Sequence, residues 1–176
     1  MSDTSNTQGG ETAQTGTQSG APPIAIHAQY IKDLSFENPL SPASLMPLTK
    51  PPQIDLNVMV KMRQLEGRTF EVALVMGADA RNVESNDALF IMELVYCAVV
   101  TLGEVPQEAV GPLLLIETPR LLFPFARAIL ANVSREAGFP PLQVAPVDFV
   151  ALYRQQQEQG QVKMPDLGKP ADAPVN

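Results

Sequence analysis

The segment LLFPFARAILANVSREAGFPPLQVAPVDF, residues 121–149, decides how this chain folds, because it joins a long helical pattern to a proline-rich run. Apolar residues recur at steps of three and four, which predicts a helix with a core face of Leu122, Phe125, Ala126, Ile129, Val133 and Ala137. We expect Thr118 to cap this helix, Pro119 to occupy its first position and Gly138 to end it. Pro124 lies beyond the first turn and is expected to bend the helix.

Upstream of this helix the apolar pattern changes to period two, which is typical of strands with one buried face. Four strands are predicted at about residues 24–37, 54–63, 70–76 and 89–102. Consecutive strands joined by short turns favour an antiparallel meander. A weak helix over 106–116, the long helix and a last helix from about Asp148 then follow. The pattern predicts an α+β fold, a four-stranded antiparallel sheet with helices packed on one face.

The last predicted strand is apolar on both faces. Phe90, Met92, Leu94 and Tyr96 lie on one face, and Ile91, Val95 and Cys97 lie on the other. One layer of helices covers one face only, so the second face is expected to meet another subunit or a groove. We therefore predict that the chain forms a tetramer at micromolar concentration.

The two ends of the chain differ in composition from the middle. Residues 1–23 are rich in Ser, Thr, Gln and Gly, and residues 161–176 are polar with Pro and Asp, so both are predicted to be disordered tails. The residues between the tails, 24–160, are predicted to form one domain. The N-terminus lacks the basic start and apolar core of a secretory signal. The longest nearly apolar run, Ala88–Leu102, contains Glu93 and is too short to span a bilayer, which predicts a cytoplasmic protein rather than an integral membrane protein.

A long connection, NPLSPASLMPLTKPPQ, links the first two predicted strands over residues 38–53. It contains five prolines, so it is expected to be extended and stiff, with no regular secondary structure. Connections of this length inside a compact domain tend to be functional. Its apolar side chains, Leu40, Leu45, Met46 and Leu48, are unusual for a solvated loop.

The charge of the chain narrows its possible partners. The formal net charge is −7 with a pI of about 4.6, and no run of Lys and Arg is present. Nucleic acids and anionic membranes are therefore poor partners, whereas basic polypeptide segments suit the surface better.

No set of residues in the sequence indicates catalysis, a metal or a cofactor. His27 is the single histidine and is expected to be a polar surface residue, and Cys97 is the single cysteine and is expected to be a small core residue. Ser35, His27 and Asp33 fall on one predicted strand, so a catalytic triad from them is a weak idea. No motif of a hydrolase, nucleotide-binding protein or zinc protease is present. We expect no enzyme activity.

Two separated motifs carry a resemblance to a known family. Leu122–Arg127 reads LFPFAR, Gly138–Leu142 reads GFPPL, and Val144–Phe149 reads VAPVDF. Together these resemble the helical half of the bacterial protein-export chaperone SecB, with Phe125 where that family usually has Tyr. Gln29–Pro39, QYIKDLSFENP, is similar to the first-strand motif of the same family. The resemblance covers about residues 24–157 and leaves out both tails.

The resemblance implies a fold, an assembly and a function. Members of the SecB family are homotetramers, dimers of dimers, with helices sandwiched between two eight-stranded sheets. They bind unfolded precursor proteins without ATP, keep them from folding or aggregating, and deliver them to the export motor SecA. By matching positions, the residues implied for SecA binding are Asp33, Glu37, Ile91 and Glu93. Even spacing places each pair on one face of its strand, if no bulge intervenes.

The client groove implied by the resemblance is apolar. The candidate residues are Leu40, Leu45, Met46, Leu48, Phe123, Phe125, Phe139 and Phe149. The corresponding loop of better-known members contains aromatic residues, including Trp, whereas this chain has no Trp. An alternative from another class is a small-ligand-binding or enzymatic α+β domain with its pocket under the connection 38–53, which a cluster of titratable groups would favour. A purely structural oligomer is a third alternative.

Overall fold

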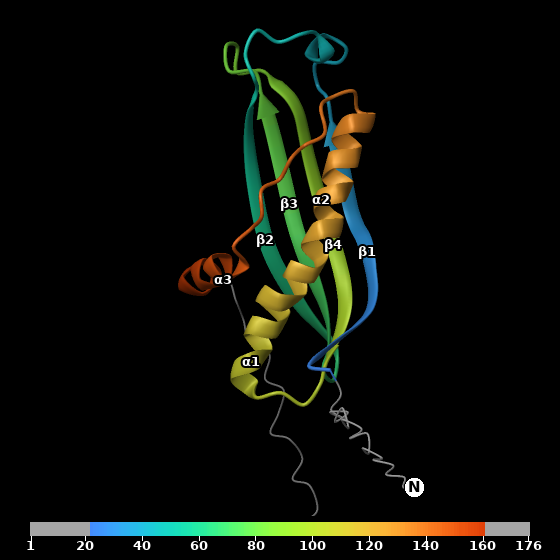
Figure 1. The fold of residues 1–176 in the computed structure, drawn as a ribbon, viewed down its shortest axis with the longest axis vertical. Helices are drawn as coiled ribbons and strands as arrows, with labels where there is room; N and C mark the ends of the chain where they lie inside the picture. Colours follow the sequence, from blue (N-terminus) through green and yellow to red (C-terminus); the bar gives the residue numbers. More distant parts are fainter. Residues whose placement is uncertain (1–21, 161–176) are drawn as a thin grey trace, which may run out of the picture.

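A computed structural model describes residues 22–160, and its centre is a four-stranded antiparallel sheet. The strands are β1 (Ile24–Glu37), β2 (Gln53–Glu66), β3 (Thr69–Arg81) and β4 (Ala88–Leu102). The helices pack on one face of this sheet (Figure 1). The four predicted strands and the α+β class are thereby confirmed. Residues 1–21 and 161–176, which make up nearly all of the predicted tails, lie outside the described residues.

The expected meander is wrong at β1. The strand order is β1-β4-β3-β2, so β2, β3 and β4 follow one another but β1 lies beside β4. β1 pairs antiparallel with β4 from Ile24 opposite Leu102 to Glu37 opposite Ile91. The period of a strand reveals its buried face but not its neighbour, which is why the pattern missed this pairing. The connection after β1 must cross from one edge of the sheet to the other, about 14 Å at the usual strand spacing.

This crossing explains the length of the proline-rich connection, which passes over one end of the sheet (Figure 1). The connection was expected to have no regular secondary structure, and this expectation is wrong at one place. It contains a 3-10 turn, η1 (Ala43–Leu45). The hydroxyl of the buried Ser44 donates to Oδ1 of Asn38 at 2.6 Å. The turn therefore satisfies its polar groups locally while its apolar side chains remain free to face outward.

The first helical stretch runs without a break through α1 (Gln107–Pro112), a π-helical segment η2 (Leu113–Glu117) and α2 (Thr118–Glu136). The predicted cap at Thr118 is therefore wrong, since Thr118 is fully buried inside the helix and its hydroxyl donates to the carbonyl of Leu113 at 2.9 Å. Pro119 has no N–H to continue an α-helical pattern. A wider turn just before such a residue lets the helix continue with different hydrogen bonds.

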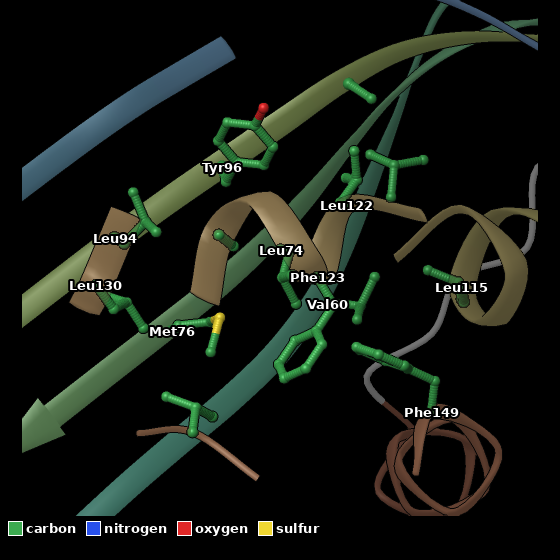
Figure 2. Close-up of a cluster of buried hydrophobic side chains, with 14 of the residues drawn as sticks. Val60, Leu74, Met76, Leu94, Tyr96, Leu115, Leu122, Phe123, Leu130 and Phe149 are labelled. Carbon is green, nitrogen blue, oxygen red and sulfur yellow. The ribbon is translucent and has the colours of Figure 1, made fainter. Parts of the chain in front are cut away.

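The core lies between α2 and the sheet (Figure 2). The buried face of α2 comprises Leu122, Phe123, Ala126, Leu130 and Ser134, and these pack on side chains of β3 and β4. The prediction that Phe125 belongs to the core face is wrong. Its side chain is about half exposed at the margin of the helix and stacks on the Tyr96 ring, with 6.5 Å between centroids.

Both ends of the following segment are well defined. α2 ends as predicted next to Gly138, whose φ of +89° favours glycine, and the Phe139 N–H donates to the carbonyl of Ser134. α3 (Phe149–Glu158) begins as predicted at Asp148, whose carboxylate accepts hydrogen bonds from the N–H groups of Val150 and Ala151. α3 lies beside β2 (Figure 1), where the Gln156 side chain donates to the carbonyl of Val60 at 3.0 Å. No helix within residues 22–160 is long and apolar enough to cross a membrane.

Candidate functional site

An apolar pocket of about 590 Å³ lies under the proline-rich connection. One wall is the connection itself, and the opposite wall is the segment that follows α2. The floor comes from the strand ends. The lining residues are Ser44, Leu45, Met46, Pro47, Leu48, Pro51, Pro52, Ile54, Leu89, Phe90, Gly138, Phe139, Pro140, Pro141, Leu142 and Gln143. We call this site the proline-walled pocket.

The structure brings together about half of the residues predicted for a client groove. Leu45, Met46, Leu48 and Phe139 line the proline-walled pocket. Leu40 is exposed on the same connection but is not among the lining residues. The side chains of Leu45, Met46 and Leu48 are 44%, 63% and 39% exposed, far more than apolar side chains in the core. They therefore present apolar surface that a bound segment would cover.

Three predicted aromatic residues lie elsewhere. Phe123 and Phe149 are buried in the core and meet edge to face, with 5.9 Å between ring centroids. Phe125 stacks on Tyr96 of β4. None of the three lines the proline-walled pocket. The motif that contains Phe123 and Phe125 therefore builds the core and its margin, while the turn after the helix contributes to the pocket.

Sequence reasoning missed the floor of the pocket. Ile54 at the start of β2 and Leu89 and Phe90 at the start of β4 line it. Phe90 contacts Phe36 and Phe139, with ring centroids 5.4 and 4.9 Å apart, so aromatic rings still support this end of the sheet although the chain has no Trp. No period in the sequence marks these residues, because only the strand order brings the start of β2 and the start of β4 to the same end of the sheet.

Gly138 lets the two walls approach each other. A Cβ atom at this position would lie 3.2 Å from Cδ2 of Leu45, closer than ordinary van der Waals contact. The positive φ and the close approach of Leu45 both favour glycine here. The end of α2 and the proline-rich connection are thereby held in contact.

A buried serine fixes the second wall to α2. The Ser134 hydroxyl donates to the carbonyl of Ala131 and accepts a hydrogen bond from the N–H of Leu142 at 2.8 Å. We predict that Ser134→Ala lowers the free energy of unfolding by about 1–3 kcal/mol, because the buried Leu142 N–H loses its partner. Chemical denaturation followed by circular dichroism measures this loss. Ser85→Ala, in the exposed turn before β4, is the control and should change little.

The face of the sheet opposite α2, which we call the open face, brings together the four residues matched to SecA binding. Across the β1–β4 pair, Asp33 lies opposite Val95, Ser35 opposite Glu93 and Glu37 opposite Ile91. The register shift in this half of β1 lies between Ile31 and Asp33, so no bulge separates Asp33 from Glu37. Directly opposed residues share a face, so Asp33, Glu37, Ile91 and Glu93 form one acidic patch with one apolar residue.

Further along the open face, Glu71 links three strands. Its carboxylate accepts hydrogen bonds from the Tyr30 hydroxyl at 2.5 Å and from Lys32 Nζ at 2.7 Å, and Arg63 lies at 3.4 Å. The Lys32 ammonium and the Tyr30 hydroxyl hold the pKa of Glu71 below its ordinary value. The same hydrogen bond, with burial, raises the pKa of Tyr30 to about 12. Both partners thus keep their neutral-pH forms, which suits a structural link.

An apolar patch remains uncovered where β1 meets α2. Leu121 and Phe125 of α2 are 51% and 52% exposed, and Ile31 and Leu34 of β1 are also exposed. Ile31 lies opposite Tyr96, on which Phe125 stacks, so the side chains of the two elements are contiguous. We call Ile31, Leu34, Leu121 and Phe125 the edge patch. Apolar side chains gathered in this way are typical of a surface that another chain covers.

The positions of the candidate catalytic residues do not favour an enzymatic function. His27 Nε2 lies 2.8 Å from Thr101 Oγ1, and His27 is eight residues from Ser35 on β1, about 26 Å at the usual strand rise. No triad forms among these residues. Burial and the Glu71 carboxylate raise the pKa of the Cys97 thiol, which disfavours the nucleophilic thiolate. The lining of the proline-walled pocket contains no Asp, Glu, His, Lys, Arg, Cys or Tyr.

Comparison with known proteins agrees with these features. Residues 17–160 match the family model "Preprotein translocase subunit SecB". The protein-export protein SecB of Granulibacter bethesdensis is 49% identical over 85% of this chain and 91% of its own length. That of a Bradyrhizobium species is 53% identical over 78% and 83%. A SecB-like chaperone of Mycobacterium tuberculosis, solved with a peptide from an antitoxin, has the same fold, with a TM-score of 0.57, 12% identity and coverage of 72% and 91%.

Proposed function

Because the chain belongs to the SecB family, we propose that it is an ATP-independent holdase for unfolded precursor proteins, acting in the cytoplasm and delivering its clients to SecA. In this proposal a client segment enters the proline-walled pocket and is kept from folding or aggregating. Residues 24–160 form the chaperone domain. SecB proteins are chaperones rather than enzymes, and the work of such a protein is binding and release.

The observation that carries this proposal is the chemistry of the proline-walled pocket. Its lining is apolar and without ionisable groups, which suits varied apolar segments rather than one defined small molecule. Its prolines limit the entropy that the walls lose when a client binds. Met46, the most exposed of the apolar residues on the connection, has a flexible side chain that adapts to different partners.

Refolding kinetics test this function. A chemically unfolded precursor that refolds slowly is diluted into buffer with and without the protein, in the absence of nucleotide. The proposal expects the yield of folded precursor to fall steeply as the protein approaches equimolar concentration. An enzyme or small-ligand-binding protein would leave the rate and yield unchanged, and that result would remove the proposal.

We propose that SecA docks on the acidic patch. Asp33, Glu37 and Glu93 present negative charge to solvent around Ile91, and such charges mainly set the rate of association with a basic partner and its sensitivity to salt. We predict that Asp33→Lys or Glu93→Lys weakens SecA binding by about tenfold or more at low salt, since each reverses a contact charge.

Titration with purified SecA at low and moderate salt measures this effect. Assembly and client holding are expected to survive in both variants, because Asp33 and Glu93 are exposed and contribute little to the core. Glu108→Lys, at an exposed position on α1, is the matched charge reversal away from the open face. Unchanged SecA affinity in both open-face variants would remove this docking site.

We further propose that the protein is a homotetramer, a dimer of dimers. The edge patch supports this, because it leaves apolar side chains of two elements uncovered next to an edge strand. A second chain could cover the patch and pair with that strand at the same time.

A further inference from the structure

The open face changes its chemistry along the strands in three bands. At one end lies one carboxylate from each strand, Glu37 of β1, Glu93 of β4, Asp79 of β3 and Asp55 of β2. The register places Glu37, Ile91, Asp79 and Asp55 in one row across the sheet. The acidic band therefore extends beyond β1 and β4 to the opposite edge strand, with the charge of Asp79 neutralised by Arg81, which lies 2.8 Å from its carboxylate.

The middle band is apolar. Met59 of β2, Val75 of β3 and Val95 of β4 lie opposite one another in a second row, and each is partly exposed. On β1 this row ends at Asp33, opposite Val95, so the apolar band spans the other three strands. The helices pack on the other face of the sheet, so no helix within residues 22–160 covers these side chains. A partner that docks on the acidic end can reach them without passing over any of the described helices.

The third band is basic. Lys61 lies opposite Ala73, and beyond it Lys32 and Arg63 surround Glu71. Glu71 neutralises part of the charge of Lys32 and Arg63, and because Lys61 adds a third cation the band stays positive. Lys61 is exposed, and within the described chain its ammonium makes no hydrogen bond or ion pair. A cation held in this way on a protein of net charge −7 is available to an acidic group of a partner.

Between the acidic and apolar bands the open face has no side chain at Gly77. This residue lies opposite Glu93 on β4 and opposite Asn57 on β2. A Cβ atom here would meet Asn57 Cβ at 3.9 Å and the carbonyl oxygen of Met92 at 4.0 Å, both ordinary contacts. The fold does not need glycine at this position, and a glycine within a strand lets another chain approach the backbone closely.

We propose that the docking partner lies flat over all three bands and carries acidic groups that face Lys61 as well as basic groups that face Glu93. The inference rests on the proposed docking of SecA and adds a second, oppositely charged contact to it. The rows of Glu93 and Lys61 are four residues apart, about 13 Å along the strands. This exceeds the Debye length of about 8 Å at physiological salt, so the two ends act nearly independently. Two opposite charges fix the orientation of the partner, which the acidic patch alone does not.

The inference is tested by whether one charge reversal, Lys61→Glu, weakens or tightens SecA binding. If the partner were simply basic, Lys61→Glu would tighten SecA binding, because it removes a repulsive charge. The bipolar contact expects the opposite, a weakening of about fivefold at low salt that fades as salt is added. Arg154→Glu, on the exposed side of α3, makes the same change in net charge away from the open face and should leave the affinity equal or slightly tighter.

A steric variant completes the test. Gly77→Val is expected to keep the circular dichroism spectrum and client holding while weakening SecA binding by about fivefold or more, because it adds a branched side chain beside Glu93 and keeps the partner from the backbone. Equal or tighter binding by Lys61→Glu, or unchanged binding by Gly77→Val, would overturn the inference. If Glu93→Lys weakens binding while Lys61→Glu does not, only this inference fails. If neither Asp33→Lys nor Glu93→Lys weakens binding, the proposed docking of SecA fails as well.

Discussion

Replacing Leu45, Met46 and Leu48 together with serine is expected to weaken the binding of an unfolded client by about 3 kcal/mol, or roughly 100-fold, at about 1 kcal/mol for each apolar anchor lost. All three side chains line the proline-walled pocket and are substantially exposed in the free protein. Their removal therefore costs contact area with the client and little core packing. A titration of a fluorescently labelled, permanently unfolded polypeptide, followed by anisotropy, measures the change.

The control for this variant is Leu65→Ser combined with Val83→Ser. Both positions are apolar and about as exposed as those in the connection, but they lie outside the pocket. The control should bind the client like the original protein, and thermal unfolding should show that both variants stay folded. If the triple variant holds clients as well as the control does, the connection is not a client-binding wall.

The second large effect is expected in assembly. At micromolar concentration the protein should sediment as a tetramer, and Leu121→Glu combined with Phe125→Glu should shift it to smaller species. The edge patch is apolar, and burying two unpaired carboxylates in an interface costs several kcal/mol. Analytical ultracentrifugation over a range of concentrations measures the shift.

Leu65→Glu is the matched control for the assembly variant, because it adds a charge at an exposed apolar position outside the edge patch. It should sediment like the original protein. A stable monomer of the original protein at micromolar concentration would contradict the tetramer. A tetramer that survives both substitutions would show that its interface lies elsewhere.

The sequence predicts the elements of this fold better than their arrangement. All four strands could be identified, because alternation such as Phe70, Val72, Leu74 and Met76 is the direct result of burying one face. The position of β1 beside β4 could not, since no periodicity encodes a neighbour, although a 16-residue connection is too long for a hairpin. Phe125 was misplaced because a helical pattern gives the apolar side of a helix but not the width of the surface that covers it.

For the sites, too, residue spacing could be used for prediction, whereas the arrangement of the elements could not. The shared face of Asp33 and Glu37 follows from spacing alone, because the bulge of β1 lies just before Asp33. Phe123 and Phe149 were assigned to a groove because they are aromatic, yet they fill the core. The floor residues Ile54 and Phe90 were missed because they reach the pocket only through the strand order.

Light scattering by an aggregating client tests the central claim most directly. A chemically unfolded protein that aggregates on dilution is mixed with increasing amounts of this chain, without nucleotide. The account predicts that scattering is suppressed almost fully near one tetramer per client chain, and that the Leu45, Met46 and Leu48 variant needs a large excess to do the same. Scattering that rises at the same rate and to the same level with and without the protein would contradict the account.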